Sequence, residues 1–443
     1  MNLYLNIEIL NREFQSKLLI AMESASRGMD VYLGRLKPYL MRDFFAPGII
    51  LDKSITPTPV RLKEMEYCKK KNFIYTSLDE EIGITNVDDN NLTYRFSNES
   101  LKLADKVFCW GRRDYDMLSK KFRKHKNKFV LSGNPRVDFW RKDFDFFYKK
   151  KKLEYNNYIL FSLNFDYFWM SQSEFKKVLK FNVDSKYVDR GITLESLKKK
   201  KRDSYKMYKK FSKLITTLAK KTDLKIIVRP HPIDPLKNYN FLSKYKNVRV
   251  IKKGPISEWI YYAKVVVHSG CTGGLESSLR NRPTISYCPN NSSFGFKFAN
   301  LYSKKTTSLN ECIKLIKKSI KDDFKLKKIN LKDIKDRAYN LFTKETSFKI
   351  ITDEFIKLQK IKKIKKKNNN LSLRFKFKIR DFRSKILNYQ YGSTGPYGNV
   401  KFTIFEKDET LKLFDIFKEL NPKYNNLSID FIKKDIIHIK NND

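Results

Sequence analysis

One stretch near residue 270 constrains the fold of this chain more than any other. Val265, Val266 and Val267 form a continuous apolar run, which is typical of a parallel strand covered on both faces. A turn of small residues follows, and Leu275 opens a predicted helix. A strand, a small-residue turn and a helix in this order present backbone N–H groups and the positive helix end to an anion. The stretch predicts an α/β fold with a phosphate site, although an ordinary tightly packed βα turn would show the same pattern.

The side chains of this turn add ligands for a nucleotide. Ser269 and Thr272 carry hydroxyl donors, and Glu276, in the first helical turn, is placed to accept hydrogen bonds from ribose hydroxyls. The other candidate donor-binding residues of the stretch are His268, Gly270 and Gly273.

A second predicted strand, Leu224–Val228, ends in the motif Arg229–Pro232. In an open α/β sheet, ligands bind beyond the carboxyl ends of the strands, where both polar clusters are expected. The guanidinium of Arg229 is a forked donor for phosphate, and the imidazole of His231 can donate from either ring nitrogen. Together the clusters predict one nucleotide pocket, with a capping or core histidine as the alternative for His231.

The charge of the chain is extreme. Its 443 residues include 93 Lys and Arg against 48 Asp and Glu, a formal net charge of +45. Such a balance points to nucleic acid or an anionic membrane surface, but the basic residues are scattered through every segment. The sequence has no paired-cysteine finger, aromatic RNP-like strand or heptad-tailed basic helix, so no nucleic-acid partner is predicted.

Cysteine spacing and hydropathy suggest a compartment. The five cysteines are widely spaced without C-x-x-C pairs, which argues against a zinc site or disulfide framework and fits a reducing cytoplasm. We expect no signal peptide and no membrane span, because no run of about 18 apolar residues occurs. The expected location is cytoplasmic, with a peripheral position at the inner face of the membrane as the alternative.

Alternating strand and helix signals divide the chain into two α/β halves. Residues 1–150 are predicted to form an N-terminal Rossmann-like acceptor domain and residues 151–345 a second Rossmann-like domain for the nucleotide sugar. Residues 346–443 are predicted to form a C-terminal helix, a basic linker and a small appendage. The first half has no G-x-G-x-x-G, so no dinucleotide site is assigned there. Two such halves would leave a cleft for a ligand between them.

The C-terminal region contains a basic segment, residues 360–380. A lysine-rich run is followed by Leu371–Arg380, in which apolar and polar residues alternate. Such a segment can lie on an anionic leaflet, gaining roughly 1 kcal/mol per basic residue near the surface. A solvated linker with a charged helix is the alternative.

Three adjacent carboxylates, Asp79, Glu80 and Glu81, follow the predicted strand Phe73–Leu78. A carboxylate at the carboxyl edge of a parallel sheet can take a proton from a sugar hydroxyl, if its pKa and position are suitable. The alternative is a solvated loop or an acidic helix N-terminus.

As a set, these motifs resemble the bacterial surface carbohydrate biosynthesis protein family, whose members look like GT-B glycosyltransferases. A fainter likeness continues past Tyr397. The matching pieces are, in chain order, Asn11–Glu13, Gly28, Val31–Gly34, Leu51–Ser54, Leu78–Glu81, Val107–Gly111, Gly133–Arg136, Arg229–Pro232 and His268–Glu276.

The resemblance implies a chemistry for these residues. The two strand-end motifs of the second half look like the nucleotide-binding motifs of bacterial sialyltransferases and of Kdo transferases, which use CMP-activated sugars. This likeness implies that His231 and Ser269 hold the phosphate of CMP. The carboxylates look like the acidic motif that supplies the catalytic base in those sialyltransferases, which assigns Glu80 as the base and Glu81 second. Ile82 stands where that motif has glycine, so the choice between the two stays open.

The resulting prediction is a GT-B-like glycosyltransferase that moves a sugar, a CMP-activated acidic sugar such as Kdo, from a nucleotide donor to a surface glycan or lipid-linked glycan. Arg12 and Glu13, after the first strand, are candidate acceptor contacts, and Asp166 is a further candidate carboxylate. No metal and no other cofactor is expected, because the carboxylates form one patch without D-x-D. The alternatives are a nucleotide-sugar 2-epimerase, a glycerophosphotransferase-like enzyme and a non-catalytic scaffold of a glycan assembly complex.

Overall fold

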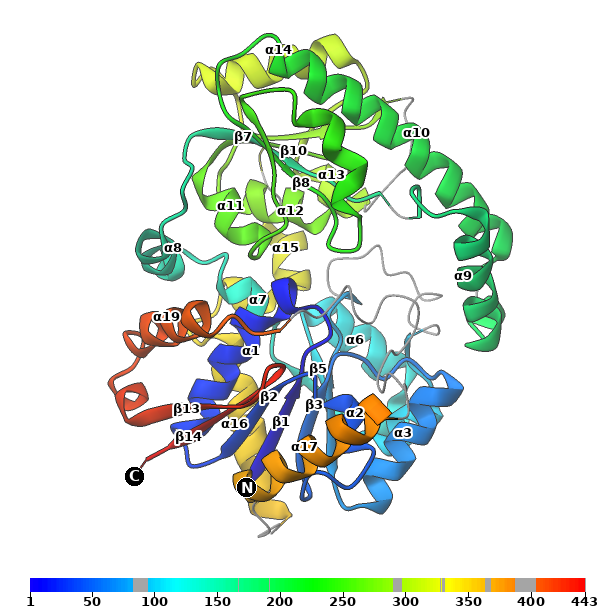
Figure 1. Ribbon diagram of the computed structural model, residues 1–443, viewed down its shortest axis with the longest axis vertical. Helices are drawn as coiled ribbons and strands as arrows, with labels where there is room; N and C mark the ends of the chain where they lie inside the picture. The colour runs from blue at the N-terminus through cyan, green and yellow to red at the C-terminus, as the bar shows by residue number, and fades with distance from the viewer. Residues whose placement is uncertain are drawn as a thin grey trace. The chain divides into compact units, whose positions relative to one another are not determined.

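The chain forms two α/β units. The computed structural model describes residues 1–82, 95–165, 167–190, 192–289, 297–326, 328, 331–362, 368–386 and 404–442. Unit 1 contains the described residues within 1–139 and 332–443, and unit 2 contains those within 140–331 (Figure 1). Asp166 lies outside the described residues.

Unit 1 is built on an eight-stranded sheet with the strand order β13-β14-β2-β1-β3-β4-β5-β6. The six strands from β2 to β6 in this order pair in parallel, as the alternating strand and helix signals predict. The strands are β1 (Asn2–Asn6), β2 (Asp30–Gly34), β3 (Gly48–Asp52), β4 (Ile74–Leu78), β5 (Lys106–Cys109), β6 (Phe129–Leu131), β13 (Leu427–Lys433) and β14 (Ile436–Asn441).

The helices of unit 1 follow the strands along the chain, and their ends carry the expected signals. Thr58 caps α3 by accepting a hydrogen bond from Arg61 N, and Pro59 occupies the first helical turn. The helices are α1 (Leu10–Ala25), α2 (Lys37–Leu40), α3 (Pro59–Lys70), α5 (Asn98–Leu103), α6 (Arg112–Lys121), η2 (Arg123–Lys128), α7 (Pro135–Asp138), α15 (Leu331–Arg337), η7 (Tyr339–Leu341), α16 (Ser347–Ile361), α17 (Asn370–Ile386), α19 (Lys407–Lys418) and η8 (Pro422–Asn426).

Unit 2 is built on a six-stranded parallel sheet with the order β12-β11-β10-β7-β8-β9. Its strands are β7 (Tyr158–Ser162), β8 (Ile226–Arg229), β9 (Val248–Val250), β10 (Ala263–His268), β11 (Thr284–Tyr287) and β12 (Lys304–Thr306). Its helices are η3 (Lys142–Phe144), α8 (Asp145–Lys151), α9 (Gln172–Asp184), η4 (Val188–Arg190), α10 (Leu194–Ala219), η5 (Leu236–Leu242), α11 (Ile256–Tyr262), α12 (Thr272–Leu279), α13 (Lys297–Leu301) and α14 (Leu309–Ile320).

Helices cover both faces of the unit 2 sheet, which explains the continuous apolar runs of its strands. Val265 and Val267 pack in one cluster with Phe211 of α10. Val266, on the opposite face, packs in a second cluster with Trp259 of α11. The prediction of an α/β protein with two Rossmann-like domains is therefore confirmed.

The C-terminal region differs from the predicted small appendage, because its last strands belong to the unit 1 sheet. β14 pairs antiparallel with β2, with Ile437 opposite Leu33, and β13 pairs antiparallel with β14. Ile436, Ile437 and Ile439 are fully buried there. The backbone of β14 pairs with the edge that β2 would otherwise expose, so this segment extends the sheet.

The segment Leu371–Arg380 is helical, although its apolar and polar residues alternate as in a strand. In a pattern with an apolar residue at every second position, apolar residues also recur four positions apart. Leu373 and Phe377 have this spacing and share one helical face. Both are buried, and the ring of Phe377 stacks on Phe44 with centroids 5.3 Å apart. Tertiary packing of this pair therefore selects the helix.

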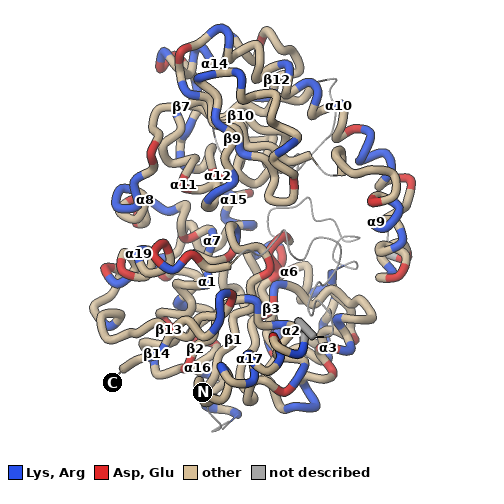
Figure 2. Tube along the Cα trace, viewed as in Figure 1, with Lys and Arg blue, Asp and Glu red and all other residues tan. Residues whose placement is uncertain are grey.

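Basic residues are distributed along both units, as Figure 2 shows. Among the helices that the structure describes, none is long and apolar enough to cross a membrane.

Candidate functional site

The carboxyl ends of β10, β7 and β8 lie side by side in unit 2. His268 is paired with Ser162, and Ser162 is paired with Arg229, so the three residues form one row across the sheet. The turns that follow β10 and β8 therefore begin at the same edge, with β7 between them. Sequence analysis missed Ser162, although its place at the end of a predicted apolar strand is a usable signal.

His268 organises the turn after β10 from inside the protein. Its side chain is fully buried, and its Nδ1 accepts hydrogen bonds from Gly270 N at 2.9 Å and Cys271 N at 3.4 Å. Its Nε2 lies 2.7 Å from Ser303 Oγ. Burial lowers the pKa of His268 to about 3, so the ring is neutral. Its Nε2–H donates a hydrogen bond to Ser303 Oγ, whose own hydroxyl donates to Ala299 O. The imidazole holds the turn in shape and has no exposed surface for a ligand.

Helix α12 begins at Thr272, with Cys271 as its N-cap, and not at Leu275 as predicted. The first turn of the helix contains two glycines, because a larger side chain at either position would come too close to residues at the sheet edge. A Cβ on Gly274 would lie 2.2 Å from the His268 ring, and one on Gly273 would lie 3.0 Å from Ser162 Oγ. Thr272, Gly273 and Gly274 thus supply the first-turn N–H groups of α12.

Two hydroxyl side chains lie at this helix start. Ser269 is 1% exposed, and its Oγ has no hydrogen-bond partner among the residues that the structure describes. Thr272 is partly exposed. A buried hydroxyl without a partner is costly, so Ser269 is suited to donate to a bound oxygen anion. Gly270 precedes the helix with a φ of +91°, which favours glycine.

The structure does not support Arg229 as a direct phosphate ligand. Its guanidinium is buried and donates short hydrogen bonds to the carbonyl oxygens of Lys253 and Gly254. It also lies 5.2 Å from the centroid of the Trp259 ring. Burial lowers the pKa of Arg229 to about 10. Arg229 therefore fixes the loop after β9, because its donors are used by backbone groups of that loop.

His231 is more accessible than Arg229. It is partly exposed, and its Nδ1 accepts a hydrogen bond from Ile233 N at 3.4 Å. The neighbouring Asp234 is buried and accepts from Tyr239 Oη at 3.1 Å and Trp169 Nε1 at 3.3 Å, which anchors the loop. The Nε2 edge of His231 is thus the group of this motif best suited to a ligand.

Glu276 lies deeper than the predicted ribose contact requires. Because α12 starts at Thr272, Glu276 is one turn inside the helix, and its side chain is buried. Its negative charge contributes to raising the pKa of Tyr148, for which burial is the larger cause. Direct contact between Glu276 and a ribose stays a prediction. The structure places this buried carboxylate four residues after the first residue of α12.

The predicted catalytic carboxylates of unit 1 lie after β4, where the parallel strands β1, β3 and β4 end together. Glu80 N donates to Lys53 O, after β3, at 3.2 Å, and Lys17 Nζ donates to Asn6 O, the last residue of β1, at 2.6 Å. Lys17 Nζ is also 3.7 Å from Glu80 Oε1. Three loops are therefore joined around Glu80 and Lys17.

Glu80 combines burial with incomplete neutralisation. It is 4% exposed, and its Oε2 has no hydrogen-bond partner within the described part of the chain. Burial and the nearby Glu13 raise the pKa of Glu80, although Lys17 and Arg136 oppose the shift. Arg136 Nη1 lies 3.8 Å from Glu80 Oε2, farther than a hydrogen bond. This carboxylate is the candidate base of the cluster, because a raised pKa suits proton abstraction near neutral pH.

The Asp79 carboxylate is engaged in contacts that hold the loop after β4, which does not favour a role as the base. Its carboxylate accepts hydrogen bonds from the backbone N–H groups of Glu81 and Ile82. It also forms a bidentate ion pair with Arg95 at 2.7 and 2.8 Å. All of these contacts hold the loop after β4 in place.

Glu81 is the exposed member of the three. Its side chain is 51% exposed and lies 3.4 Å from Arg12 and 3.3 Å from Arg95. About half of the Glu81 side chain contacts solvent, so it lacks the near-complete burial of Glu80.

Glu13 does not offer a free surface for an acceptor. Its fully buried carboxylate accepts from the backbone N–H groups of Glu8 and Ile9 and pairs with Lys17 at 2.7 Å and Arg12 at 3.2 Å. Although burial opposes the shift, Lys17 and Arg12 hold the pKa of Glu13 below its usual value. Glu13 therefore positions Lys17 and Arg12, of which Arg12 is partly exposed.

Sequence analysis missed Lys17, Arg95 and Arg136 as members of this cluster. Lys17 stands four residues after Glu13 on α1, a spacing that predicts a helical ion pair. Arg136 belongs to a motif that sequence analysis had already singled out. Arg95 has no local signal, because its approach to Asp79 depends on the tertiary fold.

Comparisons with known proteins identify no family for this chain. No protein-family model matches it, and no curated protein matches it. Solved structures with a similar fold include UDP-GlcNAc 2-epimerase from Methanocaldococcus jannaschii in complex with UDP-GlcNAc and UDP, at 12% identity and a TM-score of 0.46, covering 81% of this chain and 100% of that one. UDP-GlcNAc 2-epimerase from Neisseria meningitidis bound to UDP-GlcNAc has 10% identity and a TM-score of 0.44, with 81% and 100% covered. The wall teichoic acid polymerase TagF has 13% identity and a TM-score of 0.45, with 82% and 89% covered. At these values the likeness is a coarse one of fold.

Proposed function

We propose that the protein is a glycosyltransferase that moves a sugar from a nucleotide donor to a surface-glycan acceptor. The observation that carries the proposal is the start of α12. There the buried Ser269 hydroxyl, which has no partner among the described residues, lies at the N-terminus of α12, at the sheet edge that also bears His231. Donors gathered at a helix N-terminus favour a phosphate group.

The donor site is assigned to unit 2. Ser269, Thr272 and the first-turn N–H groups of α12 would bind a phosphate oxygen, and His231 Nε2 would donate to the same group. His268 is neutral and buried, so it shapes this site without adding charge. Negative charge grows on the nucleotide phosphate as the glycosidic bond breaks, and these donors would stabilise it. The likeness of the two motifs to those of CMP-sugar enzymes favours a CMP-linked acidic sugar such as Kdo.

Glu80 is the proposed general base. In the transfer step the acceptor oxygen forms a bond to the anomeric carbon while its proton passes to Glu80. The bond from the anomeric carbon to the phosphate oxygen breaks, and its electron pair leaves with CMP. The 4% exposure of Glu80 requires that the acceptor hydroxyl reaches an almost buried carboxylate. Arg12, which is partly exposed near Glu81, is the proposed acceptor contact.

A thermal-shift series with CMP, CDP, UDP and GDP tests the donor site. A nucleotide at 100 times its dissociation constant should add about 2.7 kcal/mol of stability. We expect CMP to give the largest shift, and His231→Ala and Ser269→Ala each to weaken its binding about 10-fold. Ser204→Ala is the matched control, because Ser204 Oγ in α10 is also buried without a described partner. No nucleotide binding, or equal binding by Ser269→Ala and Ser204→Ala, would contradict the donor site.

Release of CMP from a CMP-sugar, with and without acceptor, tests the reaction. We expect Glu80→Gln to lower kcat about 10²- to 10⁴-fold while CMP binding stays unchanged, and the wild-type rate to rise with pH as Glu80 loses its proton. Glu81→Gln is the control and should act much more weakly. Change of the sugar without acceptor would favour an epimerase, and full function of His231→Ala in glycan assembly would favour a scaffold.

A further inference from the structure

We propose that the outward face of α17 docks on an anionic phospholipid membrane. This inference goes beyond the proposed transferase reaction, because it concerns a surface of unit 1 and does not depend on any catalytic residue. Figure 1 shows α17 in orange on the outside of unit 1.

The inner face of α17 is anchored to the unit. Leu373 and Phe377 are buried, and Phe377 contacts the aromatic rings of Tyr39, Phe44 and Phe45. At the N-terminal end of the helix, Asn370 accepts a hydrogen bond from Tyr32 Oη at 2.8 Å. The helix is therefore held on the body, and its opposite face is fixed in orientation.

That opposite face exposes large apolar side chains. Leu371 is 78% exposed, and Phe375 and Phe382 are each 65% exposed. Residues four and eleven positions after Leu371 fall on the same side of a helix, so the three side chains form one stripe. Ile379, which is also exposed, continues it. Leaving two phenylalanines in water is unfavourable, so the stripe favours an apolar partner.

Basic residues border this stripe. Lys378 lies on one side of it, and Lys376 and Arg383 lie on the other; all three are exposed. Residues 360–380 contain no acidic residue. Lys363–Lys367, in the basic run before the helix, lie outside the described residues.

The nearby acidic side chains do not cancel this charge. Asp430 of β13 pairs with Arg374 at 2.6 Å, and Asp381 of α17 pairs with Lys433. Asp43, which also interacts electrostatically with Lys376, pairs with Lys71 at 2.9 Å. Lys376, Lys378 and Arg383 together therefore leave a net positive charge beside the apolar stripe.

This combination fits a membrane surface better than a protein partner. Interfacial helices present an apolar stripe to the acyl boundary and basic residues to anionic headgroups. The fully buried part of a protein interface, in contrast, is depleted of lysine. Phe375 and Phe382 would enter the headgroup region while the flanking lysines and arginine contact lipid phosphates.

Co-sedimentation of the full chain with vesicles tests the proposal. Vesicles of phosphatidylcholine with phosphatidylglycerol should bind the protein, and vesicles of phosphatidylcholine alone should bind it at least about 10-fold more weakly. The triple variant Leu371→Ser/Phe375→Ser/Phe382→Ser should lose at least about 10-fold in partitioning. Lys376→Glu/Lys378→Glu/Arg383→Glu should lose at least as much, and added salt should weaken wild-type binding.

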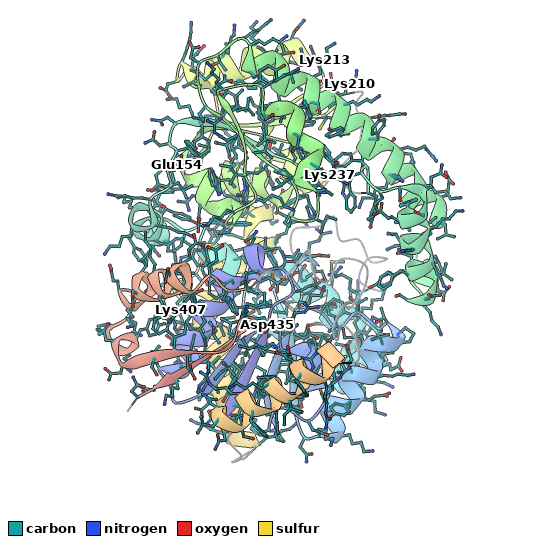
Figure 3. All side chains as sticks on the ribbon, in the orientation of Figure 1. Glu154, Lys210, Lys213, Lys237, Lys407 and Asp435 are labelled. Carbon is teal, nitrogen blue, oxygen red and sulfur yellow. The ribbon has the colours of Figure 1, made fainter. Side chains whose placement is uncertain are left out.

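Matched variants elsewhere separate this surface from the general positive charge. Lys210, Lys213 and Lys237 lie on unit 2 (Figure 3), and their joint reversal to Glu changes the net charge by the same amount. Val60→Ser/Phe181→Ser/Val183→Ser removes other exposed apolar side chains. Both controls should bind vesicles like wild type.

Three outcomes would overturn the proposal. They are equal loss in the α17 and control variants, no preference for anionic vesicles, and a self-association in sedimentation velocity that only the α17 apolar variant abolishes. A thermal unfolding midpoint close to that of the wild type shows that each variant is folded. This control does not use CMP, so a failure of this proposal stays separate from a failure of the proposed function.

Discussion

The two sheets end in polar groups of opposite kinds. At the edge of the unit 1 sheet, ionised side chains neutralise one another: Lys17 lies between Glu13 and Glu80 in a buried network. At the edge of the unit 2 sheet, a neutral imidazole, hydroxyls and backbone N–H groups surround the start of α12.

The charge balance of each edge indicates which kind of ligand it can bind. The unit 1 edge already holds both signs of charge, so it is stable as it stands and can tune the proton affinity of Glu80. At the unit 2 edge, the guanidinium of Arg229 donates to backbone carbonyl groups, and the Ser269 Oγ has no partner among the described residues. A phosphate would complete the second edge but would compete with Glu13 and Glu80 at the first.

Removal of the buried cation of unit 1 should have the largest effect on stability. Lys17→Met would leave Glu13 and Glu80 buried beside each other, and we expect a loss of about 3–5 kcal/mol in the free energy of unfolding, measured in urea. Lys199→Met is the control, because Lys199 forms an exposed helical pair with Asp203 at the same four-residue spacing. A loss below about 1 kcal/mol would show that charge does not organise the unit 1 edge.

The unit 2 edge should instead be sensitive to shape. Gly274→Ala would place a methyl group 2.2 Å from the buried His268 ring, so we expect a loss of about 1–3 kcal/mol by the same measurement. Gly273→Ala should cost less, because the nearest atom to its Cβ would be Ser162 Oγ at 3.0 Å. An equal loss of stability in the two variants would indicate that the contact with His268 contributes nothing specific at Gly274.

The pH dependence sharpens the contrast at the unit 2 edge. Because the pKa of His268 is lowered to about 3 in the folded state, its contribution to stability is present above its unfolded pKa of about 6.5 and is lost as pH falls toward 3. His268→Asn should cost about 1–2 kcal/mol at pH 7, and the cost should shrink below about pH 6. Thermal unfolding of both proteins across this range measures it. A constant difference would contradict a neutral, buried His268.

The smallest effect is expected at the exposed rim of the unit 1 cluster. Glu81→Ala removes two ion pairs with Arg12 and Arg95, but solvent screens them, so stability should change by less than about 0.5 kcal/mol. Urea unfolding at low and high salt checks this. A larger loss would mean that the rim, and not the buried pair, supports the loop after β4.

Local patterns predicted most of the central strands and the polar ends of β8 and β10. The valines before His268 and the runs of residues 158–163 and 224–228 are continuous because both faces of the unit 2 sheet are covered. The strand β14 escaped prediction because its role depends on pairing with β2, far away in the sequence. The helix at Leu371–Arg380 was likewise decided by the packing of Phe377 against Phe44 and Phe45.

The candidate sites divide in the same way. Glu80, His231 and Ser269 were named from motifs, and their roles in binding and catalysis stay predictions. Nothing in the order of residues shows that Arg229 donates to Lys253 and Gly254 or that Glu13 is enclosed by Lys17 and Arg12, because the partners come from separate loops or a buried helix face.

By itself, the sequence determined the strand–turn–helix units and the chemical groups available at each strand end, since hydrophobic periodicity and turn composition act over a few residues. The tertiary structure decided which of those groups are buried, charged or occupied. Burial and pairing arise only when distant segments meet. They raise the pKa of Glu80, keep His268 neutral and leave the buried Ser269 hydroxyl without a partner among the described residues.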